Sequence, residues 1–201
     1  MGRLSRRDFV VGVGAAGTGL LAGCGRLPWP GPAPTAKVPR VGYLSPGAPG
    51  SGPDYSEAFR QGLRERGYVA GQNVIVEYRW AEGRVERLPA LAADLVRLPV
   101  DVLVAAASPA IWAAKQATDT IPVVMTTVAG PVEQGLVVSL ARPGGNLTGV
   151  STLSPKLAAK RVELLKHAVP DLSRVAVLWP PDNRGMVLNF QGTVEGAEAL
   201  R

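Results

Sequence analysis

Residues Val100 to Met125 read VDVLVAAASPAIWAAKQATDTIPVVM, and the rest of the chain is organised around them. Its opening run, Asp101–Ala106, is short, apolar and β-branched, which is typical of a strand buried on both faces of a parallel sheet. Ser108-Pro109 then occupies the positions of an N-cap and a first helical residue, so the pattern predicts a helix over Ala110–Thr118. A second apolar strand, Pro122–Thr126, follows directly. The stretch therefore predicts a βαβ unit, whose crossover is nearly always right-handed.

The junction between the predicted strand and helix, at Ser108, is the first candidate for a ligand-binding point. In open parallel sheets, ligands bind beyond the carboxyl ends of the strands, where helix N-termini present free N–H groups and a positive dipole end. Ser108 at such a junction is either a helix cap alone or also a ligand contact. The sequence leaves both interpretations open.

The segments before this unit repeat the alternation of strand and helix. Two strands are expected at Arg40–Leu44 and Val74–Tyr78. Two helices are expected at Tyr55–Arg66, with Asp54 as its N-cap, and at about Val85–Arg97. The order βαβαβαβ predicts an α/β fold in which a doubly wound parallel sheet has helices on both faces.

The segments after this unit predict an incomplete second α/β lobe. We expect a short helix over Glu133–Ala141, a strand over Leu147–Thr152, an amphipathic helix over Pro155–Ala168, a buried strand over Arg174–Trp179 and a last helical run to Arg201. The predicted domains are a first lobe, residues 40–150, and a partial second lobe, residues 151–201. A lone strand in the second lobe leaves both of its edges unpaired.

The first 24 residues predict export. Arg6 and Arg7 belong to a basic start, an apolar stretch follows, and Leu-Ala-Gly-Cys24 ends it. This pattern resembles a twin-arginine signal that closes on a bacterial lipoprotein box, so Cys24 is expected to carry the lipid. The Pro-rich residues 25–39 are then expected to form a tether. The alternative is an uncleaved N-terminal anchor with an incidental cysteine.

Composition and motifs argue against several functions. Cys24 is the only cysteine, which excludes an intramolecular disulfide and a cysteine-rich metal site. The net charge of +6 is spread along the chain, so nucleic-acid binding is not expected. His167 is the only histidine, and the G-x-S-x-G, H-E-x-x-H and P-loop lysine motifs are missing. Gly12–Gly17 matches a dinucleotide-binding pattern by letter but follows no strand. No catalytic residue, metal ligand or cofactor is therefore predicted.

Seven stretches share one resemblance. They read RVGYLS (Arg40–Ser45), FRQGLRERGY (Phe59–Tyr68), EYRWAEG (Glu77–Gly83), LPALAA (Leu88–Ala93), AKQAT (Ala114–Thr118), SLARPGGNLTG (Ser139–Gly149) and KRVELL (Lys160–Leu165). Together they resemble the bacterial ABC transporter substrate-binding proteins of the type I periplasmic-binding fold, in the lipoprotein family related to tryptophan-binding components. The resemblance implies two α/β lobes that close on a small, amino acid-like solute. It also implies delivery to a membrane permease driven by a separate ATPase, and no catalysis.

The resemblance further implies where the solute is bound. Contacts in such proteins come from the loops after the strands, and these positions are Ser45, Ser108 and Thr127 in the first lobe and Asp182 or Asn183 in the second. The family usually has an aspartate before the Pro-Val of the loop after the fourth strand, but Gly130 stands there in this chain. A carboxylate that could meet a ligand amine is therefore missing.

Two other functions stay open at this point. A surface-bound ligand sensor shares the same lobes and lipid anchor, and the fold alone does not exclude an enzyme. Relatives of the family run on for roughly another hundred residues, the length of a small domain, so a fragment or a truncated gene product is expected. We therefore expect Arg40–Gly149 to be the better-ordered part and the chain to bind solute weakly or not at all.

Overall fold

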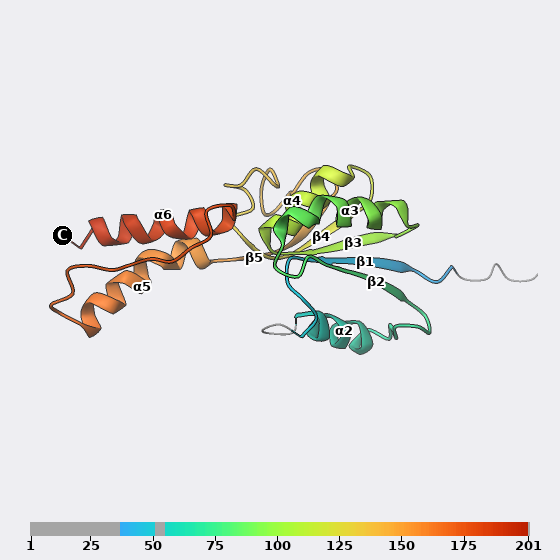
Figure 1. Cartoon of the computed structure of the whole chain (residues 1–201), viewed down its shortest axis with the longest axis horizontal. Helices are drawn as coiled ribbons and strands as arrows, with labels where there is room; N and C mark the ends of the chain where they lie inside the picture. Colours follow the sequence, from blue (N-terminus) through green and yellow to red (C-terminus); the bar gives the residue numbers. More distant parts are fainter. Residues whose placement is uncertain (1–36, 51–54, 201) are drawn as a thin grey trace, which may run out of the picture. The chain divides into compact units, whose positions relative to one another are not determined.

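The computed structural model describes residues 37–50 and 55–200. Over these residues the chain forms a five-stranded parallel sheet in the order β2-β1-β3-β4-β5, with helices on both faces (Figure 1). The predicted α/β fold with a doubly wound parallel sheet is therefore confirmed. The predicted export and lipid sites, Arg6, Arg7 and Cys24, and the predicted N-cap Asp54 lie outside the described residues.

Strands and helices alternate along the chain. The strands are β1 (Arg40–Ser45), β2 (Ile75–Trp80), β3 (Val102–Ala106), β4 (Val123–Ala129) and β5 (Leu147–Thr152). The helices are α2 (Tyr55–Glu65), α3 (Leu88–Arg97) with the preceding 3-10 turn η1 (Val85–Arg87), α4 (Ala107–Ala117), α5 (Ser154–Ala168) and α6 (Arg184–Glu198). Most predicted elements are therefore present, with their ends moved by a few residues.

Both faces of the sheet are covered, as the apolar strands predict. On one face, Leu44 of β1 shares a buried cluster with Leu95 of α3 and Ile111 of α4. On the other face, Tyr43 packs against Phe59 of α2, with ring centroids 5.4 Å apart. Figure 1 shows α2 on the opposite side of the sheet from α3 and α4. Successive residues of one strand therefore enter different layers.

The pairing of β4 with β5 contains an irregularity. Its register shifts between Met125 and Val128, which is the mark of a β-bulge. Opposite Met125, Gly149 has a φ of 146°, and a Cβ added there would lie 2.1 Å from the Met125 carbonyl oxygen. A residue with a side chain does not fit this close approach of two backbones.

The start of α4 differs from the prediction. The helix begins at Ala107, and its N-cap residue is Ala106, which makes no side-chain hydrogen bond. The prediction of Ser108 as N-cap is therefore wrong. Ser108 lies in the first turn and is 4% exposed, and its hydroxyl accepts a hydrogen bond from Gln134 Nε2 at 3.0 Å. Because this partner is distant in sequence, local pattern does not reveal it.

The predicted helix over Glu133–Ala141 does not form. The segment starts as a turn in which the Gln134 N–H donates to the Gly130 carbonyl at 2.9 Å. Gly135 then takes a φ of 70°, a left-handed conformation that ends a helical run. The residues that follow are an irregular loop whose apolar side chains, including Leu136, pack into the core.

The predicted buried strand over Arg174–Trp179 is also wrong. This segment pairs with no strand among the described residues, and the Leu178 side chain is 99% exposed. A strand needs a neighbour that satisfies its N–H and C=O groups, and apolar residues alone do not supply one. Trp179 instead stacks on Phe190 of α6, with ring centroids 4.8 Å apart.

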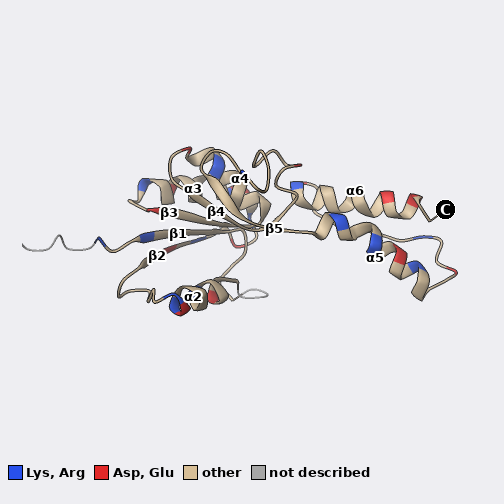
Figure 2. Cartoon of the chain, turned by 180° about the vertical axis from the view of Figure 1, so that it is seen from behind, with Lys and Arg blue, Asp and Glu red and all other residues tan. Residues whose placement is uncertain are grey.

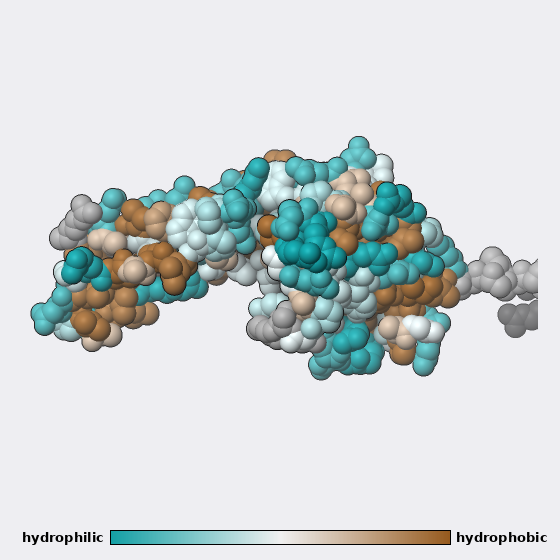
Figure 3. Space-filling view, viewed as in Figure 1, coloured by the Kyte–Doolittle hydropathy of each residue, from teal (hydrophilic) through white to brown (hydrophobic). Residues whose placement is uncertain are grey.

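Helices α5 and α6 pack closely on each other. A Cβ added at Gly196 would lie 2.5 Å from the Ala159 Cα, so the small residue allows the two backbones to approach. Much of their remaining apolar surface is exposed, including Leu157 and Leu164. Figure 3 shows hydrophobic atoms gathered over this part of the chain.

Charged side chains are spread over the surface. Figure 2 shows both basic and acidic side chains on several helices. Many of them form exposed ion pairs, such as Arg60 with Glu57 of α2 at 2.6 Å. In the part of the chain that the structure describes, no helix has the length and apolar character needed to cross a membrane.

Candidate functional site

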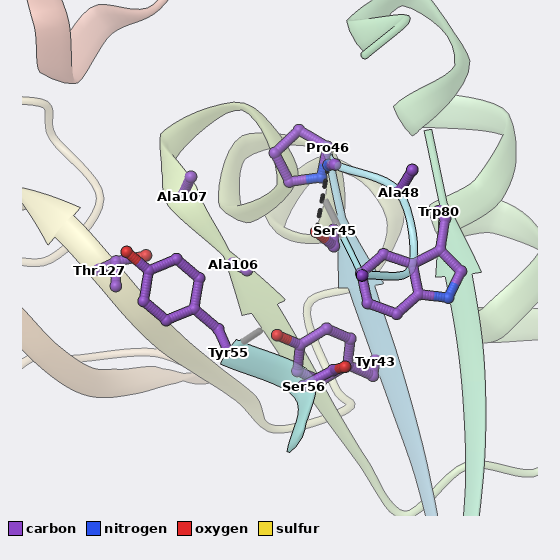
Figure 4. Close-up of a pocket in the computed structure, with 12 residues that line it drawn as sticks. Tyr43, Ser45, Pro46, Ala48, Tyr55, Ser56, Trp80, Ala106, Ala107 and Thr127 are labelled. Carbon is purple, nitrogen blue, oxygen red and sulfur yellow. Dashed lines mark hydrogen bonds between the residues drawn. The ribbon is translucent and has the colours of Figure 1, made fainter. Parts of the chain in front are cut away.

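A pocket of about 200 Å³ lies at the carboxyl ends of the parallel strands (Figure 4). Four strands reach it, the loop after β1 covers it, and the first turn of α2 completes its wall. The described residues that line it are Tyr43, Ser45, Pro46, Gly47, Ala48, Gly50, Tyr55, Ser56, Trp80, Ala106, Ala107 and Thr127. Open parallel sheets bind their ligands at this edge.

Strand register gathers three aromatic rings on one face of the sheet, and two of them, Tyr43 and Trp80, line the pocket. Parallel pairing sets Tyr43 beside Tyr78 and Ser45 beside Trp80. Because residues two apart share a face of a strand, the three rings stand on the same side of the sheet. The Trp80 ring lies 5.7 Å from the Tyr43 ring and 5.9 Å from the Tyr78 ring, nearly parallel to the latter.

Two lining residues have a left-handed backbone without being glycine. Ala107, directly after β3, has a φ of 62°, and Thr127, at the bulge of β4, has a φ of 53°. Such conformations cost about 1–3 kcal/mol each and persist only where the surroundings hold them. They gather at binding and active sites, which supports a functional role for this edge.

The polar groups of the pocket are hydroxyls. The Ser45 hydroxyl accepts a hydrogen bond from the Gly47 N–H at 3.2 Å, drawn as the dashed line in Figure 4. The Thr127 hydroxyl donates to the Thr126 carbonyl at 2.8 Å. None of the described lining residues has a charged side chain.

Two helix N-termini also reach the pocket. Tyr55 and Ser56 open α2, and Ala107 opens α4. The N-terminal end of a helix carries a partial positive charge, which favours an anionic group such as a carboxylate. The pocket therefore combines aromatic rings with a site suited to one acidic group.

The five predicted contacts do not all meet here. Ser45 and Thr127 line the pocket, whereas Ser108, Asp182 and Asn183 do not. Asn183 is the N-cap of α6, since its side-chain oxygen accepts hydrogen bonds from the two N–H groups at 185 and 186, at 3.1 and 3.3 Å. Asp182 is exposed on the loop before α6.

The lining residues that the sequence-based prediction did not name include Tyr43, Tyr55, Ser56 and Ala107. A signal existed for the first three, because Tyr43 precedes Ser45 by two positions and Tyr55-Ser56 opens a helix directly after a Gly- and Pro-rich loop. No signal marks Ala107, because a left-handed alanine looks like any other alanine in the sequence.

Glu82, two residues after the pocket residue Trp80, has its carboxylate paired with arginines. The Glu82 N–H donates to the carbonyl of Gly47, a lining residue, at 2.9 Å. The hydrogen bond from Arg87 to the Glu82 carboxylate, at 2.7 Å, holds the pKa of Glu82 below its ordinary value, and Arg84 adds to this effect. The Glu82 charge is therefore engaged with arginines.

A larger cavity of about 510 Å³ lies between α5, α6 and residues 172–177. It is mostly apolar, with Val162 and Phe190 in its wall and Lys166 and Arg174 beside them. No residue at the strand ends lines it. Within residues 37–50 and 55–200, no group of three or more His, Cys, Asp and Glu side chains could hold a metal ion.

Comparison with known proteins gives similar folds and sequences. A conserved domain protein from Vibrio cholerae is 32% identical with a TM-score of 0.73, and covers 82% of this chain and 55% of its own. The ABC domain in complex with L-Trp from Streptococcus pneumoniae is 27% identical, also with a TM-score of 0.73, and covers 81% of this chain and 54% of its own. The "Tyrosine-binding protein" of Clostridioides difficile (strain R20291) is 33% identical over 123 residues, which are 61% of this chain and 35% of that protein. The chain thus spans about half of the length of the two solved relatives.

The family comparison agrees with the architecture. Residues 53–198, which are most of the chain, match the family model described as "ABC transporter substrate binding protein". The parallel sheet and the pocket at its strand ends fit this match. The chain therefore belongs to the family of ABC transporter substrate-binding proteins.

Proposed function

We propose that the chain is the extracytoplasmic solute-binding component of an ABC import system, which passes a small solute to a membrane permease driven by a separate ATPase. One observation carries this proposal: Ser45, Trp80, Ala106 and Thr127, from four parallel strands, meet around one pocket. The family is one of solute-binding proteins and not of enzymes. Residues 40–150 form the proposed first lobe and residues 151–201 part of the second.

The pocket favours an amino acid with an aromatic side chain. Tyr43, Tyr55 and Trp80 offer rings, and aromatic pairs contribute about 0.5–1.5 kcal/mol beyond the burial of their area. The N-termini of α2 and α4 suit the α-carboxylate of such a solute. Two relatives support this choice, since one is in complex with L-Trp and the other is named a tyrosine-binding protein.

Gly130 bears on how the solute's amine is held. It has a φ of 58°, and a Cβ added there would lie 2.6 Å from Leu188 Cδ1 of α6. An aspartate at this position would therefore displace the Leu188 side chain. We propose that the hydroxyl oxygens of Ser45 and Thr127, both on the pocket wall, accept from the amine instead.

The solute contacts predicted from the sequence at Ser108, Asp182 and Asn183 stay predictions. The hydroxyl of Ser108 is already bonded to Gln134, and the side chain of Asn183 already caps α6. A solute that reached either residue would therefore exchange an existing hydrogen bond for a new one. Asp182 has the exposure that a contact from the second lobe requires.

Export and anchoring complete the proposal. Arg6 and Arg7 resemble a twin-arginine signal, and Cys24 ends a lipoprotein box. We propose that the signal is removed, that Cys24 carries the lipid, and that the Pro-rich tether holds the binding lobes on the outer face of the membrane.

A titration followed by NMR tests the binding function. L-tryptophan and L-tyrosine should shift the resonances of Ser45, Trp80 and Thr127 in the purified chain, whereas L-lysine should not. Because the chain spans about half of its solved relatives, the titration should extend to millimolar solute.

A pair of tryptophan variants sharpens this test. Trp80→Ala removes a pocket ring and should abolish the response to both aromatic amino acids. Trp179→Ala removes a ring that lies outside the pocket, stacked on Phe190, and should retain it. An absence of shifts in the unaltered chain at millimolar aromatic amino acid would refute the proposed ligand class.

A further inference from the structure

One buried polar side chain joins the strand ends on which the pocket is built. Gln134, on the loop after β4, is only 9% exposed. Its Nε2 donates to the Ser108 hydroxyl at 3.0 Å and to the Ala129 carbonyl, and its Oε1 accepts from the Trp112 indole N–H at 3.2 Å. A primary amide has two N–H donors, and both are engaged here.

Two of these partners are neighbours of the left-handed pocket residues. Ser108 directly follows Ala107, whose φ is 62°, and Ala129 lies two residues after Thr127, whose φ is 53°. Each of these conformations is unfavourable for a residue with a Cβ and needs support from its surroundings. The Gln134 amide is bonded to the backbone or side chain beside both, so one group holds two strand ends.

The first turn of α6 covers this amide cluster. The Arg184 guanidinium carbon lies 4.1 Å from the centroid of the Trp112 ring. Gly185 approaches Ser108 so closely that an added Cβ would lie 2.7 Å from its hydroxyl oxygen. A buried hydrogen bond is stronger than an exposed one, and a partner left unpaired there costs more.

We propose that Gln134 is a positioning residue of the solute pocket. Its side chain keeps Ala107 and Thr127 in the left-handed conformations that shape two pocket walls, without lining the pocket itself. The ligand part of this inference rests on the proposed function. The conformational part does not, because it concerns the ligand-free chain.

The experiment compares Gln134→Leu with Lys115→Met in the full chain. Lys115 is the matched control because its Nζ donates to the carbonyls of Gly135 and Leu136, at 2.8 and 3.1 Å, and so ties down the same loop without touching Ser108 or Ala129. In the ligand-free state, Gln134→Leu should shift the amide resonances of Ala107 and Thr127, and Lys115→Met should leave them in place. Unshifted resonances in Gln134→Leu would overturn the inference.

A measurement of solute affinity distinguishes a positioning role of Gln134 from a general contribution to stability. Gln134→Leu should weaken binding of L-tryptophan roughly tenfold, whereas Lys115→Met should stay within about twofold even where both lower the melting temperature equally. Equal losses of affinity in the two variants would reduce Gln134 to a structural residue and overturn the proposal. If the unaltered chain binds neither L-tryptophan nor L-tyrosine, the proposed function fails, and the ligand-free resonances alone decide the role of Gln134.

Gln134→Glu keeps the test decisive if the leucine variant does not fold. The glutamate has nearly the same shape and still accepts from Trp112, and the Ser108 hydroxyl can turn to donate to it, but it has no N–H for the Ala129 carbonyl. The resonance of Thr127 should therefore move more than that of Ala107. The opposite order, or no movement, would contradict the inference.

Discussion

The guanidinium carbon of Arg184 lies 4.1 Å from the centroid of the Trp112 ring, so the first residue of α6 rests on a side chain of α4. The indole N–H of Trp112 points to the buried amide of Gln134, at 3.2 Å. Trp112 thus has a cation against its ring face and a hydrogen bond at its edge. Through this ring, α6 is attached to α4 and so to the sheet that α4 covers.

Loss of the Arg184 cation should weaken this attachment measurably. A cation over an aromatic face contributes about 0.5–1 kcal/mol at an exposed site. Arg184→Gln should therefore lower the melting temperature by about 1–4 °C in a chain of this size. Circular dichroism measures the shift, and Arg184→Lys, which keeps a cation, should recover part of it. If Arg184→Gln has the same melting temperature as the unaltered chain, the contact contributes nothing to stability.

Gly149 should tolerate no side chain. In Gly149→Ala the new Cβ meets the Met125 carbonyl oxygen, 2.1 Å away before any shift, and the φ of 146° is also unfavourable. Strain and overpacking together should cost about 2–5 kcal/mol of the free energy of unfolding. Gly145→Ala is the control, because Gly145 has a φ of 64° but nothing within 4 Å. Urea denaturation should show a loss of only about 1–2 kcal/mol for the control.

Ser108 should matter for stability. Ser108→Ala leaves one buried N–H of Gln134 without its acceptor, and such a group costs about 1–3 kcal/mol. Ser154→Ala removes a half-buried hydroxyl that accepts a hydrogen bond from Arg161 on the surface, and should change the free energy of unfolding by less than about 0.5 kcal/mol. If Ser108→Ala keeps its stability but loses solute binding, the ligand-contact role predicted from the sequence is the correct one.

The Glu82 carboxyl should titrate below its ordinary range. The hydrogen bond from Arg87 lowers its pKa from 4.5, so this group favours the folded state above about pH 4.5 and loses that contribution as the pH falls through the folded-state pKa. Carboxyl NMR titration measures the value directly. In Arg87→Gln the pKa of Glu82 should rise toward 4.5, and in high salt the difference should shrink because the pair is exposed. A titration of Glu82 at its ordinary value in the unaltered chain would show that the pair does not persist in solution.

Cys24 should determine membrane attachment. With Cys24→Ala, the exported protein should be released from membranes, because the lipid has no attachment point. Arg6→Lys combined with Arg7→Lys should block export if the route is the twin-arginine one. Cell fractionation with antibody detection reads both outcomes. Retention of the Cys24→Ala protein on membranes after signal cleavage would disprove the lipid anchor.

Local pattern sufficed for β1 and β3 because a strand buried on both faces is a continuous apolar run. Val102–Ala106 shows this most clearly. The ends of β2 and β4 were harder to predict, since partners on neighbouring strands extend them. Trp80 continues β2 because it pairs with Ser45, and Ala129 continues β4 because it pairs with Thr152.

Features that depend on distant partners could not be predicted in this way. Arg174–Trp179 has the composition of a strand, but strand formation requires a neighbour that no local sequence reports. Ser108 has the sequence context of an N-cap, yet its hydroxyl is bonded to a glutamine from another loop.

The candidate site was predictable to the extent that the family resemblance and the strand topology place it. The rule that contacts come from the loops after the strands, which the resemblance supplied, named Ser45 and Thr127, and both line the pocket. It says nothing of backbone conformation, so the left-handed Ala107 was missed. It also does not reveal that the Asn183 side chain caps α6.

Because β1 lies inside the sheet, it acquires partners on both of its edges only late in synthesis. Val41 pairs with Val76 on one side and with Val102 on the other, so about 60 residues must follow it before both of its edges have partners. A ribosome adds roughly 5–20 residues per second, which makes the interval several seconds. Throughout that time, β1 has at least one open edge on which another nascent chain could pair. Factors that hold the chain apart from others in those first seconds should therefore affect its yield more than changes to the finished fold.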